Sequence, residues 1–307
     1  MKVLITGGTG FLGRSLTQHL NNLEYEVYSV GSKYWDLRSQ HVCDTLLTQV
    51  APDVIVHAAG SVGGIGANQD NPGKFMYDNL IMGANMIELS RQHEIDKFVL
   101  LGTVCAYPKH TPVPFTEDEL WNGYPEETNA PYGIAKKALM KLLETYKEQY
   151  DMNSACLIPV NMYGPHDHFN LTTSHVIPAL ILKFYNAMKN GDRTITLWGT
   201  GQASREFLYA PDCADAIVKA IEADVDPSPI NVGTGKEIKI CDLITEIAEQ
   251  MGYEGEIKYD TSKPDGQPRR CLSTMRAKKA LGFEAQTNFQ DGLMHTISWF
   301  LQDIKKV

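Results

Sequence analysis

Tyr132 and Lys136, four positions apart, form the pair of residues in this sequence best suited to acid–base chemistry. On a helix, positions i and i+4 share one face and lie about one turn apart. An ammonium group beside a phenol favours the phenolate, which makes the tyrosine a better acid–base group near neutral pH. The spacing alone is common. Tyr185 and Lys189 repeat it, and we assign that second pair no catalytic role.

The surrounding chain distinguishes the first pair from the second. Tyr132 begins a predicted helix over 132–150, which follows a predicted strand over 97–102 after a long loop. In open α/β sheets, ligands bind where the C-terminal ends of the strands converge. Thr103 lies immediately beyond that strand, where its hydroxyl can help Tyr132 hold a substrate carbonyl. Thr103, Tyr132 and Lys136 are therefore predicted catalytic residues.

A glycine pattern near the N-terminus predicts a dinucleotide-binding loop. The spacing G-x-x-G-x-x-G follows a predicted strand over 2–6 and opens a predicted helix over 11–21. Such a loop makes a tight turn, lets a pyrophosphate approach the backbone, and presents free N–H groups at the helix N-terminus. The residues expected to contact the cofactor here are Gly7, Thr9, Gly10, Phe11, Leu12 and Gly13.

The end of the second predicted strand, 25–30, indicates which dinucleotide binds. An acidic side chain there would bind the ribose 2′-hydroxyl and select NAD. This sequence has Ser32 and Lys33 instead, a hydroxyl followed by a cation, which suits a 2′-phosphate. The pattern favours NADP (NADPH). The alternative is that Lys33 is a solvated loop lysine.

Alternating strand and helix patterns predict the fold class. The predicted strands of the first half are 2–6, 25–30, 53–59, 97–102 and 155–160, separated by helical patterns that include 11–21, 74–93 and 132–150. This alternation predicts an α/β fold with a Rossmann-type, doubly wound parallel sheet. After about residue 165 the pattern loosens into strands at 194–198, 206–209, 230–232, 238–240 and 256–259, and helices at 210–223 and 241–251.

These changes along the chain predict two units. The first is an NADP-binding Rossmann domain of residues 1–165 plus about 207–223. The second is a smaller, discontinuous α/β substrate domain of residues 166–206 and 224–307.

Composition excludes several other classes of protein. The 307 residues are 43% hydrophobic and 21% charged, the balance of a globular enzyme rather than of a disordered or fibrous chain. The net charge of −9 repels nucleic acid and anionic membranes, so we expect neither as a partner. Six scattered cysteines suit no zinc site or disulfide scaffold, and no segment is typical of a signal peptide or a membrane span. We therefore expect a cytoplasmic protein without a metal.

Several blocks of sequence carry a resemblance to a known family. They are 62–65, 101–108, 129–136, 163–169, 174–178, 197–201, 205–207 and 263–266. With these blocks the chain resembles the GDP-L-fucose synthase family, a branch of the extended short-chain dehydrogenase/reductases, over nearly its whole length. The resemblance implies an NADPH-dependent enzyme that epimerises GDP-4-keto-6-deoxy-D-mannose at C3 and C5 and reduces its C4 ketone.

The resemblance also implies roles that residue types alone would not reveal. It makes Cys105 the base and His175 the acid of the epimerisations, although a cysteine after a strand is more often a small buried residue. The C4 ketone acidifies the protons at C3 and C5, and Tyr132 and Thr103 would stabilise the oxyanion that forms. In the reduction, Tyr132 gives the proton while Lys136 holds the nicotinamide ribose.

Further contacts follow from the same resemblance. The cofactor contacts extend to Asp36, Leu37, Leu101, Gly102, Lys136, Pro159, Asn161, Met162 and His175. For the substrate, Trp198 packs on the nucleotide, Arg205 meets the diphosphate, and Asp265 binds near the nucleotide or the sugar. Lys183 stands where the family often has arginine, so it keeps the charge and loses the bidentate geometry.

Two positions depart from the family pattern. Thr103 stands where serine is commoner, and Ser61 stands where other members carry lysine or methionine. Ser61 borders the sugar pocket, so another GDP-4-keto sugar, a 3,6-dideoxy or heptose derivative, remains the alternative substrate. A nicotinamide-sensing protein without catalysis is disfavoured, because it has no need of Thr103, Tyr132 and Lys136 together. By analogy, the helices at 74–93 and 132–150 are expected to form a homodimer.

Overall fold

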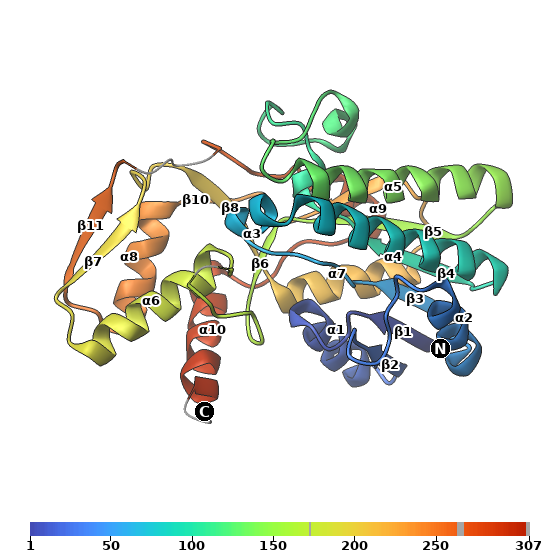
Figure 1. Ribbon diagram of the computed structural model, residues 1–307, viewed down its shortest axis with the longest axis horizontal. Helices are drawn as coiled ribbons and strands as arrows, with labels where there is room; N and C mark the ends of the chain where they lie inside the picture. The colour runs from blue at the N-terminus through green and yellow to red at the C-terminus, as the bar shows by residue number, and fades with distance from the viewer. Residues whose placement is uncertain (172, 263–266, 305–307) are drawn as a thin grey trace.

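A computed structural model describes residues 1–171, 173–262 and 267–304, and it contains a six-stranded parallel sheet with helices on both faces (Figure 1). The strands are β1 (Lys2–Thr6), β2 (Glu26–Val30), β3 (Val54–His57), β4 (Lys97–Leu101), β5 (Ser154–Pro159) and β9 (Pro229–Val232). Their order is β2-β1-β3-β4-β5-β9, so the direction of winding reverses between β1 and β3. The predicted Rossmann-type sheet is confirmed, and each strand lies within two residues of its predicted boundaries.

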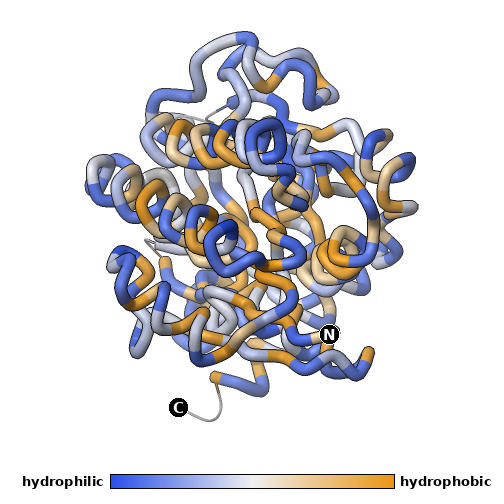
Figure 2. Tube along the Cα trace, turned by 90° about the vertical axis from the view of Figure 1, so that its right-hand side faces the viewer, coloured by the Kyte–Doolittle hydropathy of each residue, from blue (hydrophilic) through white to orange (hydrophobic). Residues whose placement is uncertain are grey.

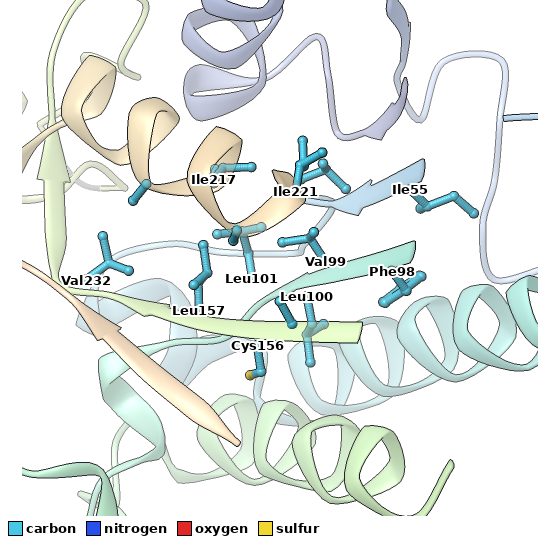
Figure 3. Close-up of a cluster of buried hydrophobic side chains, with 14 of the residues drawn as sticks. Ile55, Phe98, Val99, Leu100, Leu101, Cys156, Leu157, Ile217, Ile221 and Val232 are labelled. Carbon is cyan, nitrogen blue, oxygen red and sulfur yellow. The ribbon is translucent and has the colours of Figure 1, made fainter. Parts of the chain in front are cut away.

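Two layers of helices cover this sheet. Helices α1 (Phe11–Asn22) and α7 (Ala210–Glu222) pack together on one face, and α2 (Gln40–Val50), α4 (Pro72–Gln92) and α5 (Ala130–Tyr150) cover the other. Because β4 is buried along its whole length, its residues after Lys97 are apolar toward both layers. Figure 3 shows this alternation: Leu100 and Cys156 point toward α5, whereas Val99 and Leu157 point toward α7.

Helices α4 and α5 pack closely at one glycine. A Cβ atom at Gly83 would lie 2.2 Å from Cδ1 of Leu139, so a larger residue would require the Leu139 side chain to shift. In Figure 2 the helices carry hydrophobic and hydrophilic residues in alternation, as expected for elements with one face on a core. Among the described residues, none of the helices has the length and apolarity that a bilayer crossing requires.

A second lobe contains two small sheets and three helices. Its strands are β6 (Asn161–Tyr163), β7 (Thr194–Trp198), β8 (Ser204–Tyr209), β10 (Glu237–Lys239) and β11 (Glu256–Asp260), ordered β10-β8-β6 and β11-β7. Its helices are α6 (Val176–Asn190), α8 (Ile240–Met251) and α10 (Phe289–Asp303). Aromatic residues fill its core, among them Tyr163, Phe184, Phe207 and Phe300.

The boundary predicted at residue 224 differs from the structure. Strand β9 pairs with β5 in the main sheet, and helix α9 (Met275–Leu281) packs against it. Leu272 and Phe283 also join the core of the main sheet. The chain therefore returns to the Rossmann sheet twice after residue 224. The sequence of a short apolar strand does not reveal which strand it pairs with. The prediction therefore assigned 230–232 to the substrate domain, whereas this strand belongs to the main sheet.

Short elements complete the chain. Helix α3 (Ile65–Asp70) follows the loop after β3, and two 3₁₀ turns, η1 (Val104–Ala106) and η2 (Glu117–Trp121), lie between β4 and α5. The turn η1 starts directly after Thr103, at the C-terminal edge of the main sheet. It therefore positions two of the predicted catalytic residues.

Candidate active site

The glycine loop between β1 and α1 has the shape that a pyrophosphate requires. Gly7 has a φ of 71°, and a Cβ atom there would lie 2.8 Å from the Ala59 backbone. A Cβ atom at Gly13 would lie 2.3 Å from the Gly7 carbonyl oxygen. Only backbone fits in this turn, and the first N–H groups of α1 have no acceptor within the helix. The loop therefore suits an anionic group at the helix N-terminus.

Of the predicted cofactor residues after β2, some have exposed side chains, and others are hydrogen-bonded or buried. Ser32 and Lys33 are exposed, and the Lys33 ammonium lies 5.1 Å from the centre of the Tyr34 ring. Asp36 accepts hydrogen bonds from the Arg38 side chain at 2.8 Å, which lowers the pKa of Asp36 to about 2. The Leu37 side chain is buried in the core. Ser32 and Lys33 are thus the predicted residues with side chains open to a 2′-phosphate.

Thr103, Cys105 and Tyr132 lie together at the C-terminal end of β4. The Cys105 amide donates to the Thr103 hydroxyl at 3.2 Å, which caps η1. A Cβ atom at Gly133 would lie 2.3 Å from the Cys105 carbonyl oxygen, so the start of α5 is packed directly on this turn. Tyr132 shares a hydrogen bond with Thr103 and interacts electrostatically with Cys105. The sequence motif thus folds into one cluster of a hydroxyl, a phenol and a thiol.

Lys136 lies one turn further along α5, with its side chain only 3% exposed. Its ammonium donates a hydrogen bond to the Leu101 carbonyl oxygen at 3.0 Å. Burial lowers the pKa of Lys136 to about 8, and Cys156 acts in the opposite direction. An amine with this pKa titrates close to neutrality, as acid–base chemistry requires.

The phenol of Tyr132 does not show the lowered pKa that was expected. Burial, together with Cys105, raises the pKa of Tyr132 above its ordinary range, and the bond with Thr103 opposes this only in part. The Lys136 ammonium donates its hydrogen bond to the Leu101 carbonyl oxygen.

His175 reaches the site from the second lobe. It is the N-cap residue of α6, and the loop before it is tied to the loop after β3 by a hydrogen bond from the Gly64 amide to the Thr173 carbonyl at 3.1 Å. The histidine keeps solvent-exposed surface, and desolvation by the surrounding chain lowers its pKa. The segment that carries His175 is therefore next to Gly64, which belongs to the block 62–65 on which the resemblance rests.

The other predicted cofactor contacts lie at or just beyond strand ends. Leu101 ends β4, Pro159 ends β5, and Asn161 and Met162 belong to β6. Gly102 donates to the Leu157 carbonyl at 2.7 Å, which extends the pairing of β4 with β5. These residues line the C-terminal edge of the main sheet, where the loop after β1 also lies.

The predicted substrate contacts come from the second lobe. The Lys183 ammonium on α6 donates to the Thr196 carbonyl on β7, two residues from Trp198. The Trp198 side chain is 74% exposed, which is unusual for so large an apolar ring. Arg205 on β8 donates to the Ser204 carbonyl at 2.6 Å. Asp265 lies outside the described residues.

Two buried polar residues and one half-buried one were missed from the sequence. Glu206 is fully buried and accepts hydrogen bonds from the backbone amides of the residues 234, 235 and 272. Burial raises the pKa of Asp167 to about 7, and its Oδ2 has no partner among the described residues. His57 ends β3 and is fully buried. No local pattern signals Glu206 or His57, because their partners are distant in the sequence.

The histidines on either side of residue 167 contact neighbouring side chains. The His166 ring packs against Trp299 with centroids 4.9 Å apart, and His168 Nε2 lies 3.0 Å from the Thr173 hydroxyl. Within the described residues, no group of three or more metal-ligating side chains comes together.

A Rossmann sheet with this glycine loop and a Thr–Tyr–Lys arrangement at its C-terminal edge defines a short-chain dehydrogenase/reductase of the extended type. The family model described as "NAD dependent epimerase/dehydratase family" matches residues 3–233, well over half of the chain. The chain belongs to this family.

Named relatives give a closer comparison. The chain is 37% identical to a GDP-L-fucose synthase of Sinorhizobium fredii, over 99% of this chain and 96% of the relative. It is also 37% identical to a GDP-L-colitose synthase of Yersinia pseudotuberculosis, over 99% of each. Among solved structures, a GDP-L-fucose synthetase from Naegleria fowleri bound to NADP matches with a TM-score of 0.91 at 27% identity, over 100% of this chain and 95% of that one.

Proposed function

We propose that this protein is an NADP-dependent GDP-L-fucose synthase. It would epimerise GDP-4-keto-6-deoxy-D-mannose at C3 and C5 and reduce the C4 ketone, and so act as both an isomerase and an oxidoreductase. The observation that carries the proposal is the cluster of Thr103, Cys105 and Tyr132 at the C-terminal edge of the sheet. The identity with named GDP-L-fucose synthases over nearly the whole chain supports it.

The epimerisation needs an acid and a base on opposite faces of the sugar. Cys105 removes a proton from C3 or C5, and the electron pair moves into an enolate whose negative charge rests on the C4 oxygen. Thr103 and Tyr132 donate hydrogen bonds to that oxygen. His175, which enters from the second lobe, delivers a proton to the opposite face and inverts the centre.

The reduction uses the same phenol. NADPH, when bound, supplies the hydride that C4 accepts. Tyr132 donates its proton to the C4 oxygen, and Lys136, fixed on the Leu101 carbonyl, holds the ribose beside it. The turn after β1 and the exposed Ser32 and Lys33 would bind the pyrophosphate and the 2′-phosphate.

A second candidate substrate is a GDP-4-keto-3,6-dideoxy sugar. One relative with 37% identity is named a GDP-L-colitose synthase. Ser61, which departs from the family pattern, donates to Asp78 at 3.0 Å. A short side chain held this way would leave the sugar pocket wider than a lysine would.

An incubation in D₂O distinguishes these functions. The protein is mixed with GDP-4-keto-6-deoxy-D-mannose and NADPH, and the deuterium in the product is located by NMR. The proposal expects label at both C3 and C5, together with loss of nicotinamide absorbance. Cofactor oxidation without label would instead show a simple reductase. Faster turnover of the 3,6-dideoxy substrate would favour the alternative.

We also propose a cytoplasmic homodimer. Met76 and Tyr77 of α4 are exposed apolar residues, 38% and 61% accessible, on a helix that pairs with α5. All six cysteines are free, which suits a reducing compartment. Sedimentation of the purified protein should give twice the chain mass, and a monomer would exclude the dimer.

A further inference from the structure

His57 presents a buried polar atom that nothing in the described part of the chain satisfies. The side chain is 0% exposed, its Nδ1 lies 2.9 Å from the Thr6 hydroxyl, and its ring stacks on Phe98. The other ring nitrogen, Nε2, has no hydrogen-bond partner among the described residues. Buried polar atoms almost always have a partner, so this one requires an explanation.

The sheet register shows which way His57 faces. Thr6, His57, Leu100 and Cys156 are successive partners across β1, β3, β4 and β5. Neighbours in register point to the same face of a sheet. Leu100 and Cys156 point toward α5 (Figure 3), so His57 faces the helix layer that contains α4 and α5.

Lys136 extends from α5 over this row of residues. Its ammonium donates to the carbonyl of Leu101, the residue after Leu100. It also interacts electrostatically with two members of the row, His57 and Cys156. An ammonium has three N–H donors, and the Leu101 carbonyl occupies one of them. Donors therefore remain for a cofactor hydroxyl and for an acceptor beneath the helix.

We propose that His57 is a positioning residue for Lys136, with one water bridging its Nε2 and the ammonium, because no direct hydrogen bond joins the two groups. The histidine touches neither substrate nor cofactor. It acts by fixing the ammonium and by stabilising its charged form. The inference rests on the proposed function, because Lys136 matters only if it holds a nicotinamide ribose.

The ionisation of the ring agrees with this role. Burial, aided by Lys136, lowers the pKa of His57 to about 3, so the ring is neutral at working pH. A neutral imidazole carries one donor and one acceptor nitrogen. A nearby cation favours the lone pair on Nε2, which places the proton on Nδ1, where the Thr6 hydroxyl accepts it.

The other charged or titratable groups around Lys136 are accounted for. Cys156 faces it from β5, Tyr132 precedes it on α5, Cys105 of η1 adjoins Tyr132, and the buried Asp78 of α4 is bound by Lys74 and Ser61. The first of these keeps its proton, since burial raises the pKa of Cys156 to about 12. His57 is therefore the neutral nitrogen acceptor in this set.

Two substitutions of His57 distinguish the role of Nδ1 from that of Nε2. Asparagine places a polar atom near the position of Nδ1 and none near Nε2, whereas glutamine places one near Nε2. His57→Asn therefore keeps the contact with Thr6 and loses the one with Lys136, and His57→Gln does the reverse. The readouts are the pH profile of kcat/KM between pH 6 and 10 and the pH dependence of NADPH binding, followed by fluorescence.

We expect His57→Asn to move the alkaline fall of both profiles down by about one pH unit, because the ammonium loses a hydrogen bond. His57→Gln should keep the wild-type profile. Unchanged profiles in both variants would overturn the inference, and so would a shift confined to His57→Gln, which would assign the effect to Thr6.

A direct titration of Lys136 tests the inference independently of enzymatic activity. The Lys136 pKa is followed by NMR of labelled lysine in the cofactor-free protein, and its signal is assigned by its loss in Lys136→Arg. A lower Lys136 pKa in His57→Asn than in the wild type supports the inference, and an equal one overturns it. Failure of the wild type to bind NADPH would overturn the proposed function instead.

Discussion

The Gly64 amide donates a hydrogen bond to the Thr173 carbonyl over 3.1 Å, which ties the loop after β3 to the segment that delivers His175. A Cβ atom at Gly64 would lie 3.1 Å from the Ser174 carbonyl oxygen, tighter than ordinary contact. The position of the proposed acid therefore depends on a backbone contact with the opposite lobe. Catalytic geometry of this kind is sensitive to displacements of about 1 Å.

The first prediction follows from that contact. Gly64→Ala should displace residues 173–175 and lower deuterium incorporation at C3 and C5 by about tenfold, with NADPH affinity unchanged. The matched control is Gly66→Ala, because a Cβ atom there meets nothing within 4 Å. Equal exchange rates in the two variants would show that this contact does not position His175.

The second prediction separates the two half-reactions. Tyr132→Phe removes the phenolic proton donor, so hydride transfer should fall by about 100-fold or more while solvent exchange at C3 and C5 persists at a reduced rate. Cys105→Ser replaces the thiol by a much weaker base and should mainly abolish that exchange. Stopped-flow absorbance measures the first step, and NMR of deuterium uptake measures the second.

The control for Tyr132→Phe and Cys105→Ser is a test that both variants still fold. Both variants should retain the wild-type circular dichroism spectrum, because each change removes or exchanges one atom. If each variant lost both activities to the same degree, the division of roles between the phenol and the thiol would be wrong.

The strands of the main sheet could be predicted because each carries its own signal. The run Val54–His57 is apolar on both sides, and the first strand ends at a glycine pattern. Helix α6 escaped prediction, although its apolar face is strong, because it follows a loop whose polar residues hid its start. The position of β9 also escaped, since its partner, β5, lies about seventy residues earlier.

The residues of the candidate site could likewise be predicted only where a local pattern marks them. Tyr132, Lys136 and Thr103 could be found from spacing and from their place after a strand. The hydrogen bond from Lys136 to Leu101 could not, because it depends on how α5 crosses β4. Nor could His57, whose neighbours Thr6, Leu100 and Cys156 meet only through the sheet register.

The third prediction concerns the choice of cofactor. Lys33→Ala should weaken NADPH binding by about tenfold and leave NADH binding unchanged, because the ammonium pairs with a 2′-phosphate that NADH lacks. The loss should shrink as salt is raised. Lys236→Ala, an exposed lysine in the second lobe, is the control. An equal loss for both cofactors would mean that Lys33 supports the loop rather than the phosphate.

The fourth prediction concerns the stability cost of burying Lys136. Its pKa falls from an ordinary 10.5 to about 8, a difference that corresponds to at most about 3 kcal/mol. Below pH 8 the lysine is charged in both folded and unfolded chains, so the folded state carries the whole cost. Between pH 8 and 10.5 the folded state loses the proton first, and the cost disappears.

Lys136→Met should therefore abolish reduction yet raise the free energy of unfolding at pH 7, and this gain should shrink toward pH 10.5. Urea denaturation at several pH values measures it. Lys141→Met is the matched control, since Lys141 is an exposed residue of the same helix and should show no such trend. A gain that stays constant between pH 7 and 10.5 would indicate better packing of methionine, not relief of a buried charge. A gain that declines would show that the protein sacrifices stability to keep an ammonium beneath its active site.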